Sequence, residues 1–115
     1  MNDEQLKKMI EISDNISKEQ NLIIELEMQE SDLKYKMFLI EQNTMSYVIG
    51  EYDAHGKNRF GNAESRQAEV AFRLDKNEEY KSLKKEISNN MYKRKLLGAG
   101  IENEKRVYDI YMKYY

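Results

Sequence analysis

The sequence predicts an all-α fold, a long antiparallel coiled-coil helical hairpin with a short extra helix near its loop end. Three observations lead to this prediction. The 115 residues include no proline, the residue that most often breaks a helix. Charged residues make up 35% of the chain and hydrophobic residues 40%, a balance typical of long helices. Hydrophobic residues also recur at coiled-coil spacing toward both ends of the chain.

The first predicted helix covers about residues 3–49, which contain neither glycine nor proline. Its seam consists of two mostly apolar rows, each repeating every seven residues. The rows are Ile12, Glu19, Leu26, Leu33, Ile40 and Tyr47, and Ile16, Ile23, Glu30, Met37 and Thr44. Glu19 and Glu30 interrupt this seam, and we expect bases of the other long helix to face them.

Residues 50–62 form the predicted loop, because the helical pattern stops there and three of the five glycines occur there. Their turn chemistry places His55 and Gly56 at the tip of a small hairpin. A short helix over residues 63–74 follows, and Asn62 is its expected N-cap.

The last predicted helix covers about residues 76–114, after a break at which Asp75 and Glu78 form a capping-box pattern. Its seam rows are Tyr80, Ile87, Arg94, Ile101, Tyr108 and Tyr115, and Leu83, Asn90, Leu97, Glu104 and Tyr111. Arg94 is the only base in these rows, so it is the preferred partner of Glu19 or Glu30. Both long helices must bury their seams, so we expect them to fold back on each other as a single helical domain, residues 1–115.

The net charge of −2 is unevenly distributed. Residues 1–50 hold ten acids and five bases, whereas residues 76–115 hold six acids and ten bases. Acidic and basic segments of this kind can pair along their length. A two-helix core is also thin for a chain of this size, which favours a homo-oligomer, such as a dimer, or binding to a partner protein.

The residue types argue against an enzyme. The chain has no cysteine and one histidine, so it lacks a thiolate site and a two-histidine metal site. The serines and glycines match no nucleophile or phosphate-loop motif. We therefore expect no catalytic residue, no cofactor and no metal. No apolar run is long enough for a membrane span and the N-terminus is polar, so we expect a cytoplasmic protein without membrane contact.

Three groups of residues are candidates for binding. The loop mixes aromatic and charged residues, which suits recognition of a protein partner: Tyr52, Asp53, Lys57, Arg59, Phe60 and Arg66. Tyrosines near the C-terminus are candidates for self-association: Tyr108, Tyr111, Tyr114 and Tyr115. Basic residues interleaved with tyrosine are candidates for contact with single-stranded nucleic acid: Lys84, Lys85, Lys93 and Lys95.

Residues 52–87 resemble small, mostly uncharacterised helical proteins of bacteriophages. The shared pattern is a short turn with Gly56 and Lys57, an aromatic residue, an Asn-x-x-x-Arg motif, and an entry into a long helix. The aromatic residue is Phe60, the motif is Asn62 to Arg66, and the helix entry includes Glu78, Tyr80 and Leu83. Such proteins tend to be encoded near recombination and single-strand-binding genes, which implies a role beside nucleic-acid machinery in the host cytoplasm.

These observations favour a non-enzymatic phage-type accessory protein that binds another protein. The expected partner is a recombination or replication factor, or a host defence nuclease complex that the protein inhibits. An acidic helix suits either role, because it can occupy a surface built for phosphate. Two alternatives stay open, namely direct binding of single-stranded DNA or RNA through the basic third segment, and a self-assembling structural coiled coil.

Overall fold

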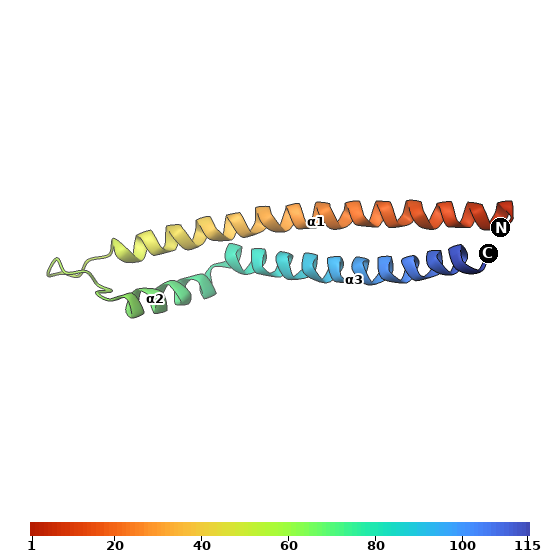
Figure 1. Ribbon diagram of the computed structural model, residues 1–115. Coiled ribbons are helices and arrows are strands. Elements are labelled where there is room, and N and C mark those ends of the chain that lie inside the picture. The colour runs from red at the N-terminus through yellow and green to blue at the C-terminus, as the bar shows by residue number, and fades with distance from the viewer. The chain divides into compact units, whose positions relative to one another are not determined.

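Three helices and one loop make up the computed structural model, which describes residues 1–115 (Figure 1). Helix α1 spans Asp3–Ile49, α2 spans Ala63–Lys76 and α3 spans Glu78–Tyr114. There is no β-strand, and the only β-bridge is an isolated one between Tyr52 and Asn58. The predicted all-α class is therefore confirmed.

Side chains that accept backbone N–H groups define where the helices begin. Asn2 accepts the N–H of Gln5 at 2.8 Å, and the Gln5 side chain accepts the N–H of Asn2 at 2.9 Å. Asn62 accepts the N–H of Ser65 at 2.8 Å and forms the N-cap of α2, as predicted. In each case the cap satisfies donors that the first helical turn cannot bond internally.

The break between α2 and α3 lies two residues later than predicted. Helix α2 continues past residue 74 to Lys76, and Asn77 rather than Asp75 separates the helices. The backbone N–H of Asn77 bonds the Leu74 carbonyl at 3.1 Å, while its side chain accepts the N–H of Tyr80 at 2.9 Å. Asn77 thus ends one helix and caps the next.

The contacts of the chain divide between two compact units. Unit 1 consists of Met1–Glu30 and Asn89–Tyr115, and unit 2 consists of Ser31–Ser88. In unit 1, Glu30 of α1 meets Arg94 of α3, and Glu19 lies next to Gly100, so the two helices are antiparallel. Unit 2 contains the end of α1, the loop, α2 and the start of α3. This pairing of α1 and α3 is that of the predicted helical hairpin.

The predicted seam rows face inward almost throughout. In unit 1, Ile101 of the predicted rows is buried, as is Met9, which lies before the predicted rows. The other apolar row positions of unit 1, apart from Tyr115, are half-buried. The buried hydrophobic residues of unit 2 are Val48, Leu74, Leu83 and Ile87. Two predicted seam positions, Tyr47 and Tyr115, are exposed instead. Near its end α1 buries Val48, four residues after Thr44, so its inward face there follows the 3.6-residue period of a straight helix.

One ion pair interrupts the apolar seam of unit 1. Arg94 donates to both carboxylate oxygens of Glu30, at 2.7 and 2.9 Å, and Glu30 is only 4% exposed. Arg94 also lies 3.8 Å from Glu27. The hydrogen bond to Glu30 is the main cause of the raised pKa of Arg94. This two-point pairing confirms that Arg94 is the base that faces one of the two seam glutamates.

Candidate protein-binding surfaces

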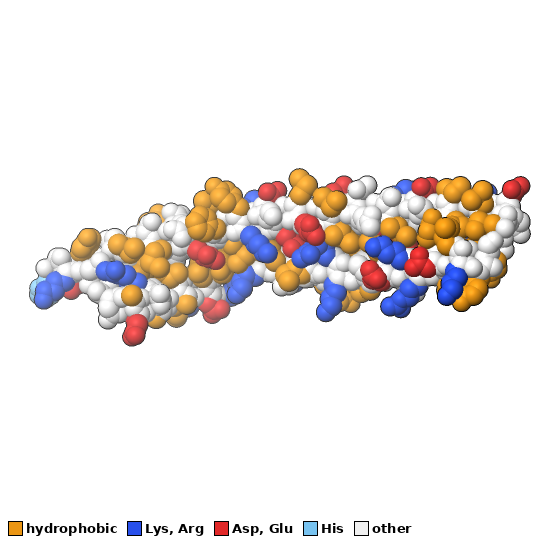
Figure 2. Space-filling model, in the orientation of Figure 1, with side chains coloured by type: hydrophobic (Ala, Val, Ile, Leu, Met, Phe, Trp, Pro, Cys, Tyr) orange, Lys and Arg blue, Asp and Glu red, His pale blue; other side chains and the backbone are white.

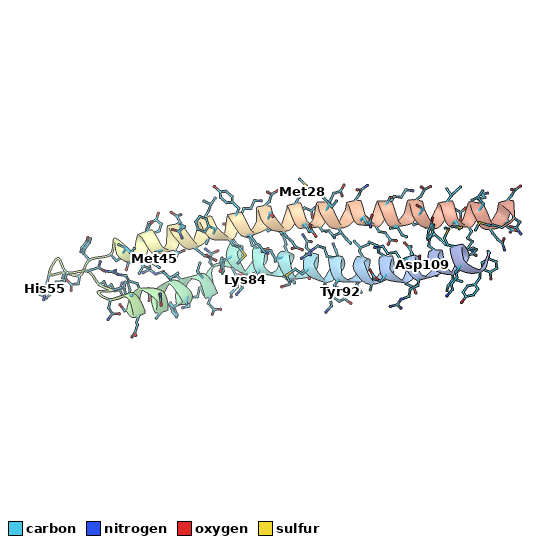
Figure 3. All side chains as sticks on the ribbon, viewed as in Figure 1. Met28, Met45, His55, Lys84, Tyr92 and Asp109 are labelled. Atoms are coloured by element: carbon cyan, nitrogen blue, oxygen red, sulfur yellow. The ribbon has the colours of Figure 1, made fainter.

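A tight turn shapes the tip of the loop in unit 2. One carboxylate oxygen of Asp53 accepts the N–H of His55 at 2.8 Å and the N–H of Lys57 at 3.0 Å. The backbone carbonyl of Lys57 also accepts the Asp53 N–H at 2.7 Å. Gly56 has a φ of +76°, a conformation that favours glycine. Figure 3 shows His55 at the tip of this turn. The turn is therefore held by its own hydrogen bonds, as the residue types predict.

Ion pairs fasten the loop to α2. Glu51 accepts from Arg73 at 2.6 Å and from Arg59 at 3.3 Å. Glu69 also accepts from Arg73 at 2.9 Å. Hydrogen bonds to Glu69 and then to Glu51 raise the pKa of Arg73, so this guanidinium stays charged and bridges the loop and the helix.

Phe60 lies within the same network. Its ring centre is 5.3 Å from the Arg59 guanidinium carbon and 5.9 Å from that of Arg73, close enough for cation–π attraction. Its carbonyl accepts the Nε–H of Arg66 at 2.9 Å. Phe60 and Arg66 are both half-buried. These two residues hold the loop against α2.

The six loop residues predicted to bind a partner thus fall into two groups. Phe60 and Arg66 are half-buried and hold the loop against α2. Tyr52, Asp53, Lys57 and Arg59 are exposed, with exposed fractions of 65% for Tyr52 and 63% for the Arg59 side chain. Two of these four also make contacts within the loop, since Asp53 accepts the turn N–H groups and Arg59 pairs with Glu51. The structure therefore places four of the six where a partner could reach them.

The four lysines of the predicted basic segment are divided between the two units. Lys84, Lys85, Lys93 and Lys95 are all exposed. The first two belong to unit 2 and the last two to unit 1. The Lys84 ammonium lies 5.7 Å from the centre of the Tyr80 ring, the one contact between a lysine of this set and an aromatic residue.

The tyrosines predicted for self-association are partly used within unit 1. Tyr108 and Tyr111 are half-buried on the seam of α3, as their spacing predicts. Tyr114 and Tyr115 are exposed, and the Tyr115 ring lies 5.1 Å from the Tyr111 ring. Tyr115 follows the last residue of α3 and is not part of the buried seam.

A groove in unit 1 was not predicted. It has a volume of about 640 Å³ and runs between α1 and α3. It is lined by four leucines, Leu22, Leu26, Leu96 and Leu97, together with Glu19, Glu25, Gln29, Lys93 and Gly100. Leu22 is 47% and Leu96 55% exposed. The sequence signal for this groove is an apolar residue beside the seam on each helix, namely Leu22 and Leu96, together with Gly100 on α3.

Glu19, at the groove, does not face a base as predicted. It faces Glu104 of α3, and one oxygen of each carboxyl is buried without a hydrogen-bond partner. Burial is the main cause of a raised pKa for Glu19, and the neighbouring Glu104 carboxyl adds to it. The prediction failed because the alignment of α3 places its single seam base, Arg94, opposite Glu30.

No group of three or more His, Cys, Asp or Glu side chains is placed to hold a metal ion. None of the three helices combines the length and apolar character that a membrane crossing requires. Comparison with protein-family models, curated proteins and solved structures gives no match, so the expected resemblance of residues 52–87 to phage proteins stays a prediction.

Proposed function

We propose that the protein is a non-enzymatic accessory protein that binds another protein through the loop of unit 2. The observation that supports this proposal is a loop held by its own contacts that leaves Tyr52 and Arg59 exposed. A loop already held in one conformation loses little conformational entropy on binding. Tyrosine and arginine are also the residues that most often contribute strongly to binding at protein interfaces.

The partner in this proposal is a cytoplasmic protein of bacterial nucleic-acid machinery. It is a recombination or replication factor, or a defence nuclease complex that the protein inhibits. The resemblance of residues 52–87 to phage proteins supports this class of partner. The excess of acids in residues 1–50 supports it as well, because an acidic helix is attracted to a surface that binds phosphate.

Affinity capture from a bacterial lysate tests the proposal with three forms of the chain. The loop variant carries Tyr52→Ala and Arg59→Ala, and the control carries Met28→Ala. Met28 is 65% exposed and projects from α1 in unit 1, away from α3 (Figure 3). We expect a protein that wild type and control retain and that the loop variant loses. Capture that is equal for all three forms would contradict the assignment to the loop.

Phe60→Ala is unsuitable for this test. The Phe60 ring lies against two guanidinium groups and its carbonyl accepts from Arg66, so the substitution would loosen the loop itself. Arg59 also contacts the Phe60 ring and pairs with Glu51 at 3.3 Å, but its side chain is 63% exposed, and exposed ion pairs contribute little to stability. Equal helix content in circular dichroism would verify that the loop variant is folded.

The alternative, binding of single-stranded nucleic acid, draws support from the exposure of Lys84, Lys85, Lys93 and Lys95. A labelled single-stranded oligonucleotide titrated at two salt concentrations distinguishes it from protein binding. Binding through lysines would weaken steeply as salt rises, because phosphate contacts release counterions. Replacement of the four lysines by glutamine would then abolish binding, while the loop variant would bind as wild type does.

A further inference from the structure

Helix α1 carries apolar residues on two faces in unit 2. Met37 and Ile40 belong to the inner seam and are half-buried. Tyr35, Phe38 and Leu39 lie on the other side of the helix, and their exposed fractions are 61%, 50% and 47%. Figure 2 shows hydrophobic side chains along the edge of α1 that faces away from α2 and α3. A helix that is apolar on both sides is typical of one packed between two neighbours, and this chain supplies neighbours on one side only.

The exposed side of α1 has the spacing of a second coiled-coil seam. Ser31, Tyr35, Phe38 and Gln42 follow one another at intervals of four, three and four residues, and all four are exposed. We call these four residues the outer seam. Residues at this spacing form one line along a helix, and another helix with the same spacing can pack on that line. The same spacing continues in the sequence before and after the outer seam, at Ile24, Met28, Met45 and Ile49.

We infer that a second copy of the chain covers the outer seam with its own outer seam, in a dimer whose two α1 helices run antiparallel about a two-fold axis. A two-fold axis presents the same patch of each subunit to the other. With the axis at the middle of the outer seam, Tyr35 meets Phe38 of the partner subunit. Ser31 then meets Gln42 of the partner subunit. Aromatic side chains therefore pack on aromatic ones and polar side chains on polar ones.

Charged residues beside the outer seam favour this alignment over others. It brings Lys34 next to Glu41 of the partner subunit on one edge, and Asp32 next to the partner's Leu39 on the other, so no like charges meet. A shift of one helix by seven residues would bring Lys34 next to the partner's Lys34, or Glu41 next to the partner's Glu41. A parallel pair would place Lys34 beside the partner's Leu39, without an acid. The outer seam is therefore complementary to itself in one orientation and one alignment.

Both charged groups are available for this pairing. Lys34 is exposed and takes part in none of the ion pairs of unit 2. It lines a cavity of about 280 Å³ together with a second base, Lys84, and no acid lines that cavity. Glu41 accepts the Tyr80 hydroxyl through Oε1, which leaves its Oε2 for Lys34 of the partner subunit. The second copy thus supplies an acid to a lysine that has none within its own chain.

Sedimentation equilibrium of the full chain over a series of concentrations tests the inference. We expect the mass to rise to twice the 13.8 kDa of one chain. Phe38→Glu places a charge on the outer seam and should give single chains. Phe72→Glu is the matched control and should leave the dimer intact, because Phe72 is 54% exposed but belongs to α2. A wild type that stays a single chain, or equal behaviour of the two variants, would overturn the inference.

A charge exchange tests the antiparallel alignment and does not depend on Phe38. Lys34→Glu alone and Glu41→Lys alone each place like charges together, so each should weaken the dimer several-fold. A mixture of the two variants restores opposite charges on both sides of the axis. Mixed dimers should therefore form more tightly than either variant forms with itself. A parallel dimer would show no such gain, and the absence of the gain would overturn the inferred arrangement.

The C-terminal tyrosines and the groove of unit 1 are the competing surfaces for self-association. Tyr114, Tyr115 and Leu96 are exposed and belong to unit 1, outside the outer seam. If Tyr114→Ala with Tyr115→Ala, or Leu96→Glu, dissociates the dimer while Phe38→Glu does not, the inference is wrong. None of these positions belongs to the loop of unit 2, so the mass measurement is independent of the partner capture proposed above.

Discussion

Arg94 and Glu30 form the one ion pair in which a carboxylate of unit 1 is almost fully buried. We expect Arg94→Met to lower the free energy of unfolding, because Glu30 would stay buried without its base. Lys81→Met is a matched control, since the Lys81–Glu78 pair is exposed and 3.8 Å long. The control should stay within about 0.5 kcal/mol of wild type in urea unfolding. Equal effects of both substitutions would contradict this role of Arg94.

Tyr80 makes a contact in unit 2 that should fail at high pH. Its hydroxyl donates to Glu41 at 2.7 Å, and burial, then Glu41, raises the pKa of Tyr80 to about 12. The folded state therefore favours the neutral phenol, whose contribution is present below pH 10 and is lost as the pH rises through about 12. We expect a loss of about 1 kcal/mol after allowance for solvent screening. Tyr80→Phe should remove this part of the pH dependence, which urea unfolding between pH 9 and pH 12 can measure.

Glu19 should act in the opposite pH range. The pKa of Glu19 is raised from its ordinary value of 4.5 by burial and by Glu104, so the folded state favours the protonated carboxyl. This contribution is present below pH 4.5 and is lost as the pH rises through the raised pKa. Glu19→Gln should therefore be more stable than wild type at neutral pH, and the difference should disappear at pH 4. A variant less stable than wild type at pH 7 would show that Glu19 makes a favourable contact there.

At the scale of the element, Gly98 is a weak point in α3. Glycine in a helix interior costs about 1 kcal/mol relative to alanine. A Cβ atom at Gly98 would meet no other atom within 4 Å. We expect Gly98→Ala to raise the free energy of unfolding by about 0.5–1 kcal/mol, measured by thermal or urea unfolding. A decrease would contradict this expectation and would indicate that another group packs closely against Gly98.

The inward faces of the long helices were predictable because their pattern is local. Each seam residue lies three or four positions from the next, so the sequence alone defines one face of each helix. The end of α2 was harder, since Asp75 and Asn77 both have capping chemistry and lie two residues apart. Val48 was missed because the seven-residue repeat continues to Tyr47, whereas the helix itself does not follow it there.

The candidate sites were less predictable, because they depend on contacts between distant residues. Arg73 of α2 engages Glu51 and Phe60, which removes Phe60 from the free surface of the loop. The residue that faces Glu19 depends on how α3 is aligned with α1, and the composition of the chain does not determine that alignment. The groove likewise requires leucines of both helices and Gly100 at the same level.

At the scale of the whole molecule, the two units differ in their cores. Unit 2 buries Val48, Leu74, Leu83 and Ile87, and unit 1 buries only Met9 and Ile101. Regions with fewer buried apolar contacts open at lower free energy. We expect amides around Leu83 and Ile87 to exchange at least about tenfold more slowly than those of the helices in unit 1. Hydrogen exchange of the wild-type chain at low concentration measures this. Equal protection of both units would contradict it.

The repeating seam of unit 1 would by itself allow more than one alignment. If α1 moved by seven residues along α3, apolar rows would still meet apolar rows, because the pattern repeats at that interval. Such a shift would place Ile23 opposite Arg94 and leave Glu30 buried away from its base. The Glu30–Arg94 ion pair therefore favours one of the alignments that the hydrophobic residues alone would permit. A variant with leucine at both Glu30 and Arg94 would have a fully apolar seam. Its molecules would all fold, but with different alignments of α1 along α3.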